Sequence, residues 1–440
     1  MSRNQCSRRT ALKSAIGFST WAGLGAADFI GAAEPVAKTG RLETFVPCRR
    51  ITPSGAHHWF GYYDKDEFDP SGRLVLANRV RFEGRSPTEE DRIEVGYIDT
   101  EAHDRWVSLG MSQAWGWQQG CMLQFIGREG SRILWNDREE DRFVCRIFDR
   151  ATRQIRTLDR PVYTVSRDGR WGLSADFRRI DNLRPGYGYD GLADPQVRQR
   201  APDESGIWRI DLETGASRLI LSLADVAKLP WPDGSTHADA WHYFNHLLIN
   251  PSATRFIVLH RYRPAFDPDT LQFKGGFVTR MLTANMEGED LCVLDPSGHT
   301  SHFIWKDDRT VTMWTRPAAR PTGFYDFVDQ TDSVLPIGHD QMPTNGHNTY
   351  LPGDHGDWIL NDTYPDRQTR RQTVYLYHVP SQRRFNLGRF PSPTRYSGEW
   401  RCDTHPRSSR DGNLVAIDSP HNEGRQVHVL DVSDLLQRES

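Results

Sequence analysis

The chain has 440 residues, a formal net charge of -3, 26 prolines, 36 glycines and 14 tryptophans. This charge balance excludes a global basic field for nucleic acid, so we expect no nucleic-acid partner. The length allows two or three average domains or one large repetitive β domain, and the many turn and aromatic residues favour β structure over a helical bundle.

The N-terminus predicts an export signal. The stretch "SRRTALK" from Ser7 precedes an apolar run that ends in small residues near Ala33. This order is typical of a twin-arginine signal, so we expect residues 1–33 to be cleaved and the mature chain to be periplasmic or secreted. Asp28 interrupts the apolar run, which is also short for a membrane anchor, and we therefore expect none.

A turn followed by a strand recurs along the rest of the chain, and each copy leads into β-branched and aromatic residues. The copies begin at Asp69, Gly127, Ser166, Asn250, Lys306, Pro352 and Ser409. These seven copies predict an all-β, seven-bladed β-propeller that occupies residues 41–436 as one catalytic domain. A β-sandwich is the alternative, but it would not explain so many similar phrases. The stretch "RLETFVPCRR" is expected to add a strand to the last blade and close the ring.

Two segments lie between the repeated phrases. Residues 182–203, rich in Gly, Pro and Tyr, form a long insertion in the third blade and predict a loop on the substrate side. Residues 224–229 are the best candidate for a short helix.

Histidine recurs four residues before the repeated turn position in the last four blades, where Leu351 is the position in the sixth blade that matches Asn250. The residues are His246, His302, His347 and His405. Equivalent positions on innermost strands converge on the propeller axis, so these imidazoles predict a site for a divalent metal such as zinc, manganese or calcium. Cys402 could add a thiolate. The alternative is that these histidines cap strand ends, and His242, which has no equivalents, ranks below His246.

The remaining cysteines do not suggest a disulfide framework. Five cysteines follow the predicted signal, at irregular spacing, and an odd count of this kind argues against such a framework. Except for Cys402, we expect them to be small buried hydrophobic residues. These four are Cys48, Cys121, Cys145 and Cys292.

The third blade contains a candidate catalytic pair. "VYTVSRDGRW" places Tyr163 at the inner start of this blade, and "ADFRRI" places Arg179 on the next strand, reached through a hairpin. A guanidinium can pair with a carboxylate and acidify the adjacent carbon, while a phenol moves the proton. The alternative is a packed aromatic residue with a surface cation.

The first two blades contain dense polar and aromatic stretches. "HHWFGYYDKDEFD" includes His57, His58, Tyr62 and Tyr63, whose rings and hydroxyls suit sugar binding. Its counterpart in the second blade, "WGWQQGCMLQF", includes a pair of glutamines that face the channel mouth or the core. No G-x-S-x-G, P-loop or dinucleotide-binding motif is present in the sequence.

These phrases, together with "GHNTY", "NDTYPD" and "RCDTHPRSSRDG", resemble the seven-bladed propeller polysaccharide lyases. That group includes oligogalacturonate lyases, ulvan lyases and related rhamnose–glucuronate-acting enzymes. The resemblance covers about residues 55–434 and implies that Tyr163 acts with histidines while Arg179 neutralises a uronate. It also implies a functional polar residue near His246.

The chain departs from the lyases in the second blade. Where those enzymes have a histidine, the nearest matches here are Gln118 and Gln119, and an amide cannot act as a base. Related rhamnosidase-type propellers use a first-blade histidine on the opposite face, for which His57 and His58 are the candidates.

We therefore expect an exported lyase that cleaves ulvan- or rhamnoglucuronan-like glycans by β-elimination. Tyr163, Arg179 and His246 would be catalytic, and Arg178 would contact substrate with Gln118, Gln119, Tyr62 and Tyr63. The alternatives are a glycoside hydrolase that releases rhamnose from glucuronate and a non-catalytic glycan-binding propeller. The expected partner is an acidic polysaccharide or oligosaccharide, and the protein is expected to be a monomer.

Overall fold

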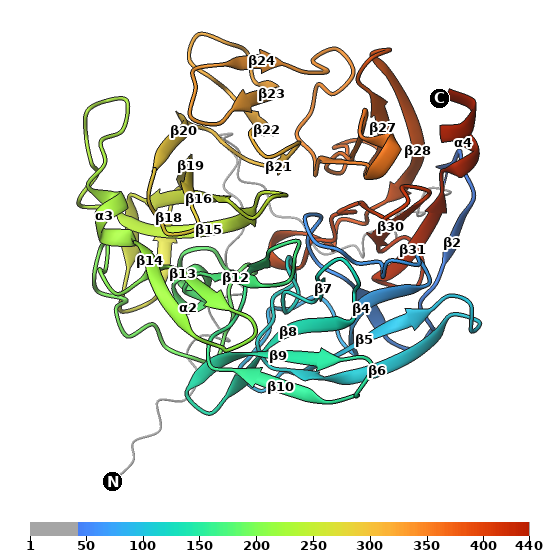
Figure 1. Cartoon of the computed structure of the whole chain (residues 1–440), viewed down its shortest axis with the longest axis horizontal. Coiled ribbons are helices and arrows are strands. Elements are labelled where there is room, and N and C mark those ends of the chain that lie inside the picture. Colours follow the sequence, from blue (N-terminus) through green and yellow to red (C-terminus); the bar gives the residue numbers. More distant parts are fainter. Residues whose placement is uncertain (1–42, 440) are drawn as a thin grey trace, which may run out of the picture.

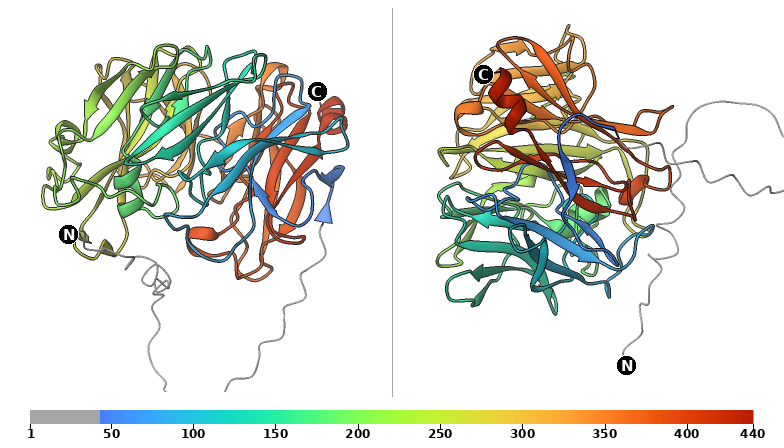
Figure 2. Two further views of the ribbon diagram at one scale, coloured as in Figure 1. Left: turned by 90° about the horizontal axis from the view of Figure 1, so that it is seen from below. Right: turned by 90° about the vertical axis from the view of Figure 1, so that its right-hand side faces the viewer.

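The computed structural model describes residues 43–439, and the predicted export signal lies outside them. Seven antiparallel sheets stand around a central axis, so the predicted seven-bladed propeller is confirmed (Figure 1). The innermost strand of each sheet faces this axis, and the side views in Figure 2 show the same ring edge-on. In residues 43–439, no helix is long and apolar enough to cross a membrane.

The first three blades have four strands each. Blade 1 contains β3 (His57–Trp59), β4 (Leu74–Val80), β5 (Ile93–Asp99) and β6 (Arg105–Ser112). Blade 2 contains β7 (Gln124–Ile126), β8 (Arg132–Glu139), β9 (Arg142–Asp149) and β10 (Ile155–Leu158). Blade 3 contains β11 (Thr164–Val165), β12 (Trp171–Ser174), β13 (Gly206–Asp211) and β14 (Ser217–Ser222).

The last four blades continue the ring. Blade 4 contains β15 (Trp241–Ile249), β16 (Arg255–Arg263), β19 (Val278–Asn285) and β20 (Cys292–Gly298), with a side hairpin of β17 (Ala265–Asp267) and β18 (Gln272–Lys274). Blade 5 contains β21 (Phe303–Trp305), β22 (Thr310–Thr315), β23 (Gly323–Val328) and β24 (Val334–Pro336). Blade 6 contains β25 (Thr349–Tyr350), β26 (Trp358–Asn361), β27 (Arg371–His378), β28 (Arg383–Pro391) and β1 (Glu43–Thr44). Blade 7 contains β29 (Arg407–Ser408), β30 (Leu414–Ser419), β31 (Gln426–Asp431) and β2 (Cys48–Arg50).

The repeated phrases form the turn between the first and second strands of each blade. The Ser409 N–H donates to the Leu414 carbonyl at 2.8 Å, and its hydroxyl accepts from the Leu414 N–H at 3.0 Å. Asn250 makes the same two bonds with Arg255, at 2.9 and 3.0 Å. The repeat of Ser or Asn therefore reflects one hydrogen-bonded turn that a short polar side chain closes.

The N-terminal part of the described chain closes the ring. Strand β2 pairs with β31 in blade 7, with Cys48 opposite Leu430, as predicted. Strand β1 pairs with β28 and extends blade 6. In Figure 1 the blue β2 accordingly lies beside the red β31, so the two ends of the described chain share one sheet.

A buried ion cluster joins blade 7 to blade 1. The Arg407 guanidinium lies 2.6 Å from Glu67 and 3.2 Å from Asp418, and these side chains are at most 2% exposed. Asp418 also accepts a hydrogen bond from the Phe60 N–H at 3.1 Å. Burial raises the pKa of Glu67 to about 7, although Arg407 opposes this shift.

Within residues 43–439, five short helical segments complete the fold. They are α2 (Phe177–Leu183), α3 (Leu223–Ala227), α4 (Ser433–Glu439), η2 (Gly353–His355) and η3 (Gly398–Trp400). Helix α3 overlaps the predicted helix. Helix α2 replaces the predicted hairpin strand, because the Asp176 side chain caps it by accepting from the Arg178 N–H. Helix α2 and the predicted insertion lie between β12 and β13, inside blade 3.

Arg407→Leu should lower the free energy of unfolding by about 3–5 kcal/mol at mildly alkaline pH, because it leaves two buried carboxylates without their cation. Urea denaturation measures the change. Arg142→Ala is the control, since Arg142 is 52% exposed and its ion pairs should contribute about 0–1 kcal/mol. If both substitutions lowered the free energy of unfolding equally, the buried ion cluster would not stabilise the contact between blades 7 and 1.

Acidification should destabilise the fold through buried histidines. Burial lowers the pKa of His58, His242 and His421 to about 4 and that of His428 to about 3. In the unfolded chain the histidine pKa has its ordinary value of 6.5, so below that pH the unfolded chain binds more protons than the folded protein. The contribution of these histidines to stability is therefore complete above pH 6.5 and falls as the pH drops towards 4. His428→Gln should reduce the slope by about 1.4 kcal/mol per pH unit. Urea denaturation of the parent and the variant at several pH values measures this slope. An equal slope in the two proteins would contradict this account.

Candidate functional site

The four histidines of the repeated register converge around one tyrosine ring at the axis. Tyr62, which is 4% exposed, lies after β3 of blade 1. Its ring centroid is 4.9 Å from that of His246, 6.5 Å from His302, 6.1 Å from His347 and 5.0 Å from His405. Tyr62 therefore separates these imidazoles into groups with different partners.

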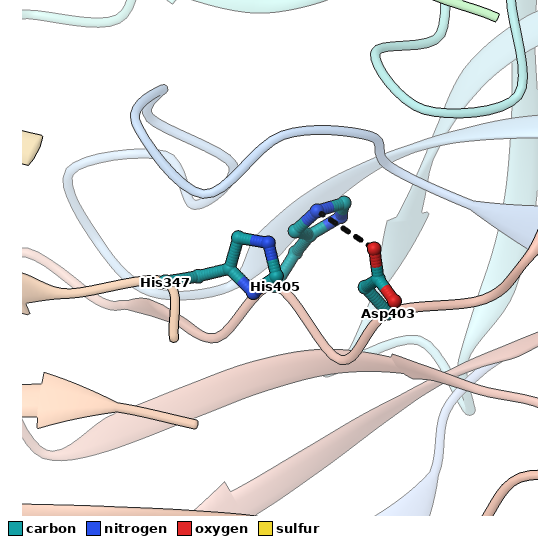
Figure 3. Close-up of side chains that lie close together, drawn as sticks. All are labelled: His347, Asp403 and His405. Atoms are coloured by element: carbon teal, nitrogen blue, oxygen red, sulfur yellow. Dashed lines mark ion pairs between the residues drawn. The ribbon is translucent and has the colours of Figure 1, made fainter. Parts of the chain in front are cut away.

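The first group is a candidate metal centre. Ligand atoms of His347, Asp403 and His405 lie within 4.8 Å of one another, and Figure 3 shows the two rings side by side with the carboxylate next to His405. Nδ1 of His347 donates to Asp362 at 2.9 Å, so the lone pair of its Nε2 is available. Nε2 of His347 and Nε2 of His405 are both buried without a hydrogen-bond partner. Two imidazoles with a carboxylate suit a divalent transition metal.

His302 lies at the edge of this group. Its ring centroid is 4.2 Å from that of His347. Its Nδ1 donates to the Asn345 side-chain oxygen at 2.9 Å, and its Nε2 lies 3.4 Å from the Tyr364 hydroxyl. The Asn345 contact directs the lone pair of His302 towards Tyr364, and His302 is not one of the grouped ligands.

The protonation of His302 and His405 favours metal binding, whereas a metal at His347 competes with a proton. Burial lowers the pKa of His302 and His405 well below the ordinary value, so both rings are neutral. Burial also acts on His347, but Asp362 outweighs it and raises the pKa of that ring. The Arg401 Nε–H donates to Asp403 at 2.8 Å and holds this carboxylate in place.

Three predicted metal ligands are not among His347, Asp403 and His405: His302 lies at the edge of the group, and Cys402 and His246 lie outside it. The predicted thiolate of Cys402 is not part of it, and the neighbouring Asp403 supplies the acidic ligand instead. Burial raises the pKa of the Cys402 thiol, which keeps it protonated. His246 lies across Tyr62 with other partners. The sequence offered a signal for Asp403, because it stands two residues before His405.

The second group joins blades 2, 3 and 4. The Tyr163 hydroxyl lies 2.7 and 2.9 Å from the two amide atoms of Gln119, 3.2 Å from Asn245 and 3.3 Å from Nδ1 of His246. Nε2 of Gln119 also lies 3.2 Å from Nδ1 of His246. Gln119 thus occupies the second-blade position and links both predicted catalytic residues. Burial lowers the pKa of His246 well below its usual value, and nearby cations add to this shift.

A backbone irregularity directs His246 to the axis. The register of β15 against β16 shifts between Asn245 and Leu247, so His246 is the extra residue of a bulge. His246 has a φ of 53° and His405 a φ of 39°, in the left-handed region that side chains rarely adopt. Such strain is retained where the surrounding contacts enforce it, which is common at functional sites.

Arg179 does not stand beside Tyr163 as a free cation. It lies on helix α2, 2% exposed, and its guanidinium nitrogens donate to three backbone carbonyls and lie 3.5 Å from Asp194. The carbonyls belong to His242, Gln199 and Arg200. The predicted carboxylate-binding role would require these bonds to break, so Arg179 serves here to hold the insertion against blade 4.

The insertion in blade 3 brings Tyr187 to the axis, which the sequence analysis missed. Tyr187 is 3% exposed, and its ring centroid lies 5.4 Å from that of His246. The preceding Gly186 has a φ of 90°. A Cβ at Gly188 would lie 2.1 Å from the Asp181 nitrogen and 2.3 Å from the Phe177 carbonyl. The Gly-Tyr-Gly order is therefore the signal, since only glycines allow this loop to pack against α2.

Cations around Tyr187 make its hydroxyl unusually acidic. Burial raises its pKa, but Arg401 and Arg184 outweigh burial and lower the pKa to about 8. An Arg401 N–H donates to the Tyr187 oxygen at 2.7 Å, and the Arg184 guanidinium lies 4.3 Å from the ring centroid. By contrast, burial and Asp64 raise the pKa of Tyr163 well above its ordinary value. The two tyrosines next to His246 are thus shifted in opposite directions.

Two arginines near His246 have unused donor capacity. Nη1 of Arg261 and Nε of Arg184 are buried without a hydrogen-bond partner. Both guanidiniums lower the pKa of His246 by their charge, which indicates that they lie close to it. Burial lowers the pKa of Arg261 to about 10, so it is still a cation at neutral pH. A buried cation with a vacant donor is suited to bind a carboxylate.

The other predicted substrate-binding residues have structural partners. Gln118 donates to two carbonyls of the loop before β29, at 2.8 and 3.1 Å. The Tyr63 hydroxyl donates to the Phe303 carbonyl at 2.7 Å and accepts from its N–H at 2.9 Å, which ties blade 1 to blade 5. Arg178 pairs with the helix cap Asp176 at 3.1 Å. These three side chains therefore hold together the loops and strands that surround the site.

His57 and His58 lie at the start of β3 and do not contact the Tyr62 ring. His57 lies 3.2 Å from Glu83. Nδ1 of His58 lies 3.2 Å from Gln426, its Nε2 is buried without a partner, and the residue lines a separate cavity of about 160 Å³. This cavity is a second, smaller candidate site.

His242 belongs to a fully paired chain. The Arg280 Nε–H donates to Nδ1 of His260 at 3.0 Å, so Nε2 of His260 carries a proton and donates to Nδ1 of His242 at 2.9 Å. Nε2 of His242 then donates to the His237 carbonyl at 3.1 Å. This chain has no vacant atom for substrate or metal, which agrees with the lower rank that the sequence gives His242.

Comparison with known proteins identifies relatives in structure but not in sequence. No family model and no curated protein matches the sequence. An oligogalacturonate lyase in complex with manganese superposes with a TM-score of 0.61 at 12% identity, covering 88% of this chain and 93% of the other. The oligogalacturonate lyase of Vibrio parahaemolyticus gives a TM-score of 0.58 at 15% identity, covering 89% and 96%. These likenesses show a shared seven-bladed propeller fold.

Metal binding is expected to stabilise the protein and to depend on His347. Manganese at about 100 times its Kd should add about 2.7 kcal/mol of stability in the parent and much less in His347→Ala or Asp403→Asn. Thermal unfolding and metal analysis after dialysis measure this. His299→Ala, a change at an exposed histidine, is the matched control. Equal metal content in the His347 variant and the parent would refute the centre.

Proposed function

We propose that the protein is an exported polysaccharide lyase that cleaves uronic-acid-containing glycans by β-elimination at the propeller axis. The carrying observation is that two tyrosines lie beside His246 in opposite surroundings: Tyr187 has the guanidiniums of Arg401 and Arg184, whereas the Tyr163 hydroxyl has the amides of Gln119 and Asn245. The guanidiniums lower the pKa of Tyr187, and burial raises that of Tyr163. A pair of groups whose pKa values are driven apart fits an acid and a base acting on one substrate.

The reaction requires a base, an acid and a cation. The base removes the proton at C5 of the uronate, the electron pair forms the C4–C5 double bond, and the C4–O4 bond breaks. The leaving O4 takes a proton, so atoms and charge balance. We assign the base role to Tyr187, whose phenolate is accessible near neutral pH, and the acid role to Tyr163, which is protonated there.

The carboxylate next to C5 needs positive charge, because the carbanion is stabilised by delocalisation into that group. Arg261 and Arg184 offer buried donors without partners for this purpose. A divalent cation at His347, Asp403 and His405 would, when bound, supply further positive charge. His246, neutral and bonded to Tyr163, would position the phenol and take part in returning its proton.

The fold supports this class of enzyme. Two oligogalacturonate lyases share it, one of them in complex with manganese. We propose an ulvan- or rhamnoglucuronan-like glycan as substrate and a periplasmic or secreted location, on the basis of the sequence. Gln119 then supports Tyr163 rather than replaces a base.

Tyr187→Phe and Tyr163→Phe should each reduce turnover of ulvan or pectic oligosaccharides by about 10²–10⁴-fold, because each removes one proton-transfer group. The ultraviolet absorbance of the unsaturated product measures the rate. In the parent, the rate should rise with pH up to about 8, as Tyr187 loses its proton. Tyr350→Phe, which changes a hydroxyl bonded to Thr312 in blade 5, is the control. Full activity of Tyr187→Phe would exclude the assignment.

A second candidate function is the release of rhamnose from glucuronate, favoured by the vacant Nε2 of His58 in a cavity lined by Arg79 and Arg81. Rhamnose release without an unsaturated product, and its loss in His58→Ala, would support this hydrolase. Glycan binding with neither product would instead indicate a binding protein.

A further inference from the structure

A cavity lies in blade 6, beside His302. Its volume is about 660 Å³. Its lining residues include Asn345 and Tyr364, and both contact His302. Through these two residues the cavity adjoins His302 at the edge of the candidate metal centre, and it extends to Arg371 of β27 and Arg389 of β28. We call it the blade 6 groove.

We propose that the blade 6 groove binds the carboxylate of a second uronate unit, so that the protein recognises an acidic chain rather than a single sugar. This inference rests on the proposed function, because it extends the same site. A volume of this size is typical of small-molecule pockets and exceeds the space that one carboxylate needs.

The charge of the groove favours an anion. Three arginines line it, Arg367, Arg371 and Arg389, against two acidic residues, Glu43 and Asp366. The formal balance of these lining residues is thus +1. Long acidic chains gain from such a local field, because each carboxylate that leaves water needs a cationic partner.

The acidic residues of the groove are already engaged. Asp366 accepts from the Gln368 N–H at 3.0 Å and from the Thr369 N–H at 2.7 Å, so its charge closes a turn. Glu43 lies 2.6 Å from Nη1 of Arg371 and 3.2 Å from Nη1 of Arg389. One carboxylate shared by two guanidiniums leaves net positive charge at this end of the groove.

The groove also offers a sugar-binding surface next to the metal centre. Tyr364 is 36% exposed, and its ring centroid lies 6.0 Å from that of His302. An exposed aromatic face can stack against a sugar ring while its hydroxyl stays polar. A chain that enters the axial site would pass Tyr364 before its next carboxylate reaches the arginines.

The test compares chain lengths by calorimetry, which detects binding with or without cleavage. We expect the parent to bind an ulvan-type tetrasaccharide, which carries two uronates, at least about ten-fold more tightly than the disaccharide, which carries one, since a second charged contact adds about 1.4 kcal/mol. In Arg367→Ala this length advantage should shrink several-fold. Arg367 has an exposed side chain away from the axis, so its replacement should not disturb folding.

Arg389→Ala is the second variant, and Arg383→Ala on the same strand, whose partner is Glu439, is the control. Disaccharide affinity should be unchanged in all three variants. Equal affinity for both lengths in the parent, no binding of either, or a full length advantage in both groove variants would overturn the inference. Length-dependent binding that the groove variants lose, in a protein that forms no unsaturated product, would retain the groove while refuting the lyase.

Discussion

Closure of the ring is the constraint on which the whole site depends. Each blade supplies one residue near the axis, in order Tyr62, Gln119, Tyr163, His246, His302, His347 and His405. No two neighbouring blades could hold this set by themselves. The pairing of β2 with β31 and the burial of Arg407 between Glu67 and Asp418 bring the first and last blades together. The ion cluster of Arg407, Glu67 and Asp418 thus supports the site without contacting it, because it helps to close the ring in which the seven blades meet.

Burial at the axis sorts the titratable groups by their partners. Most imidazoles there are neutral, because they left water without a compensating carboxylate. His347 differs because it faces Asp362. The tyrosines follow the same rule: Tyr163 has amide partners, whereas Tyr187 has two guanidiniums. One low-dielectric channel can therefore hold an acid, a base and a cation site, because the residues that contact each group set its protonation.

The fold was predictable because one hydrogen-bonded turn recurs with recognisable residues. The same register located the converging histidines, and its regularity also indicated the closing strand. Arg179 was misplaced because the capping side chain of Asp176 turned an expected strand into helix α2. Cys402 was predicted as a metal ligand, but the adjacent Asp403 lies in the candidate centre. Sequence spacing alone does not show which of two adjacent side chains faces the axis. Tyr187 was missed because it lies in an insertion, where the repeated pattern of the blades does not predict which residues reach the axis.

The Gly-Tyr-Gly loop has a consequence for how this protein could diversify. Its tyrosine reaches the axis from a segment that belongs to no sheet, and the strands on either side pair as they do in blades without it. The strand pairing of the blades and the tyrosine that we propose for proton transfer therefore lie in separate segments. A different insertion between β12 and β13 could therefore bring another side chain to the axis without a change in strand pairing.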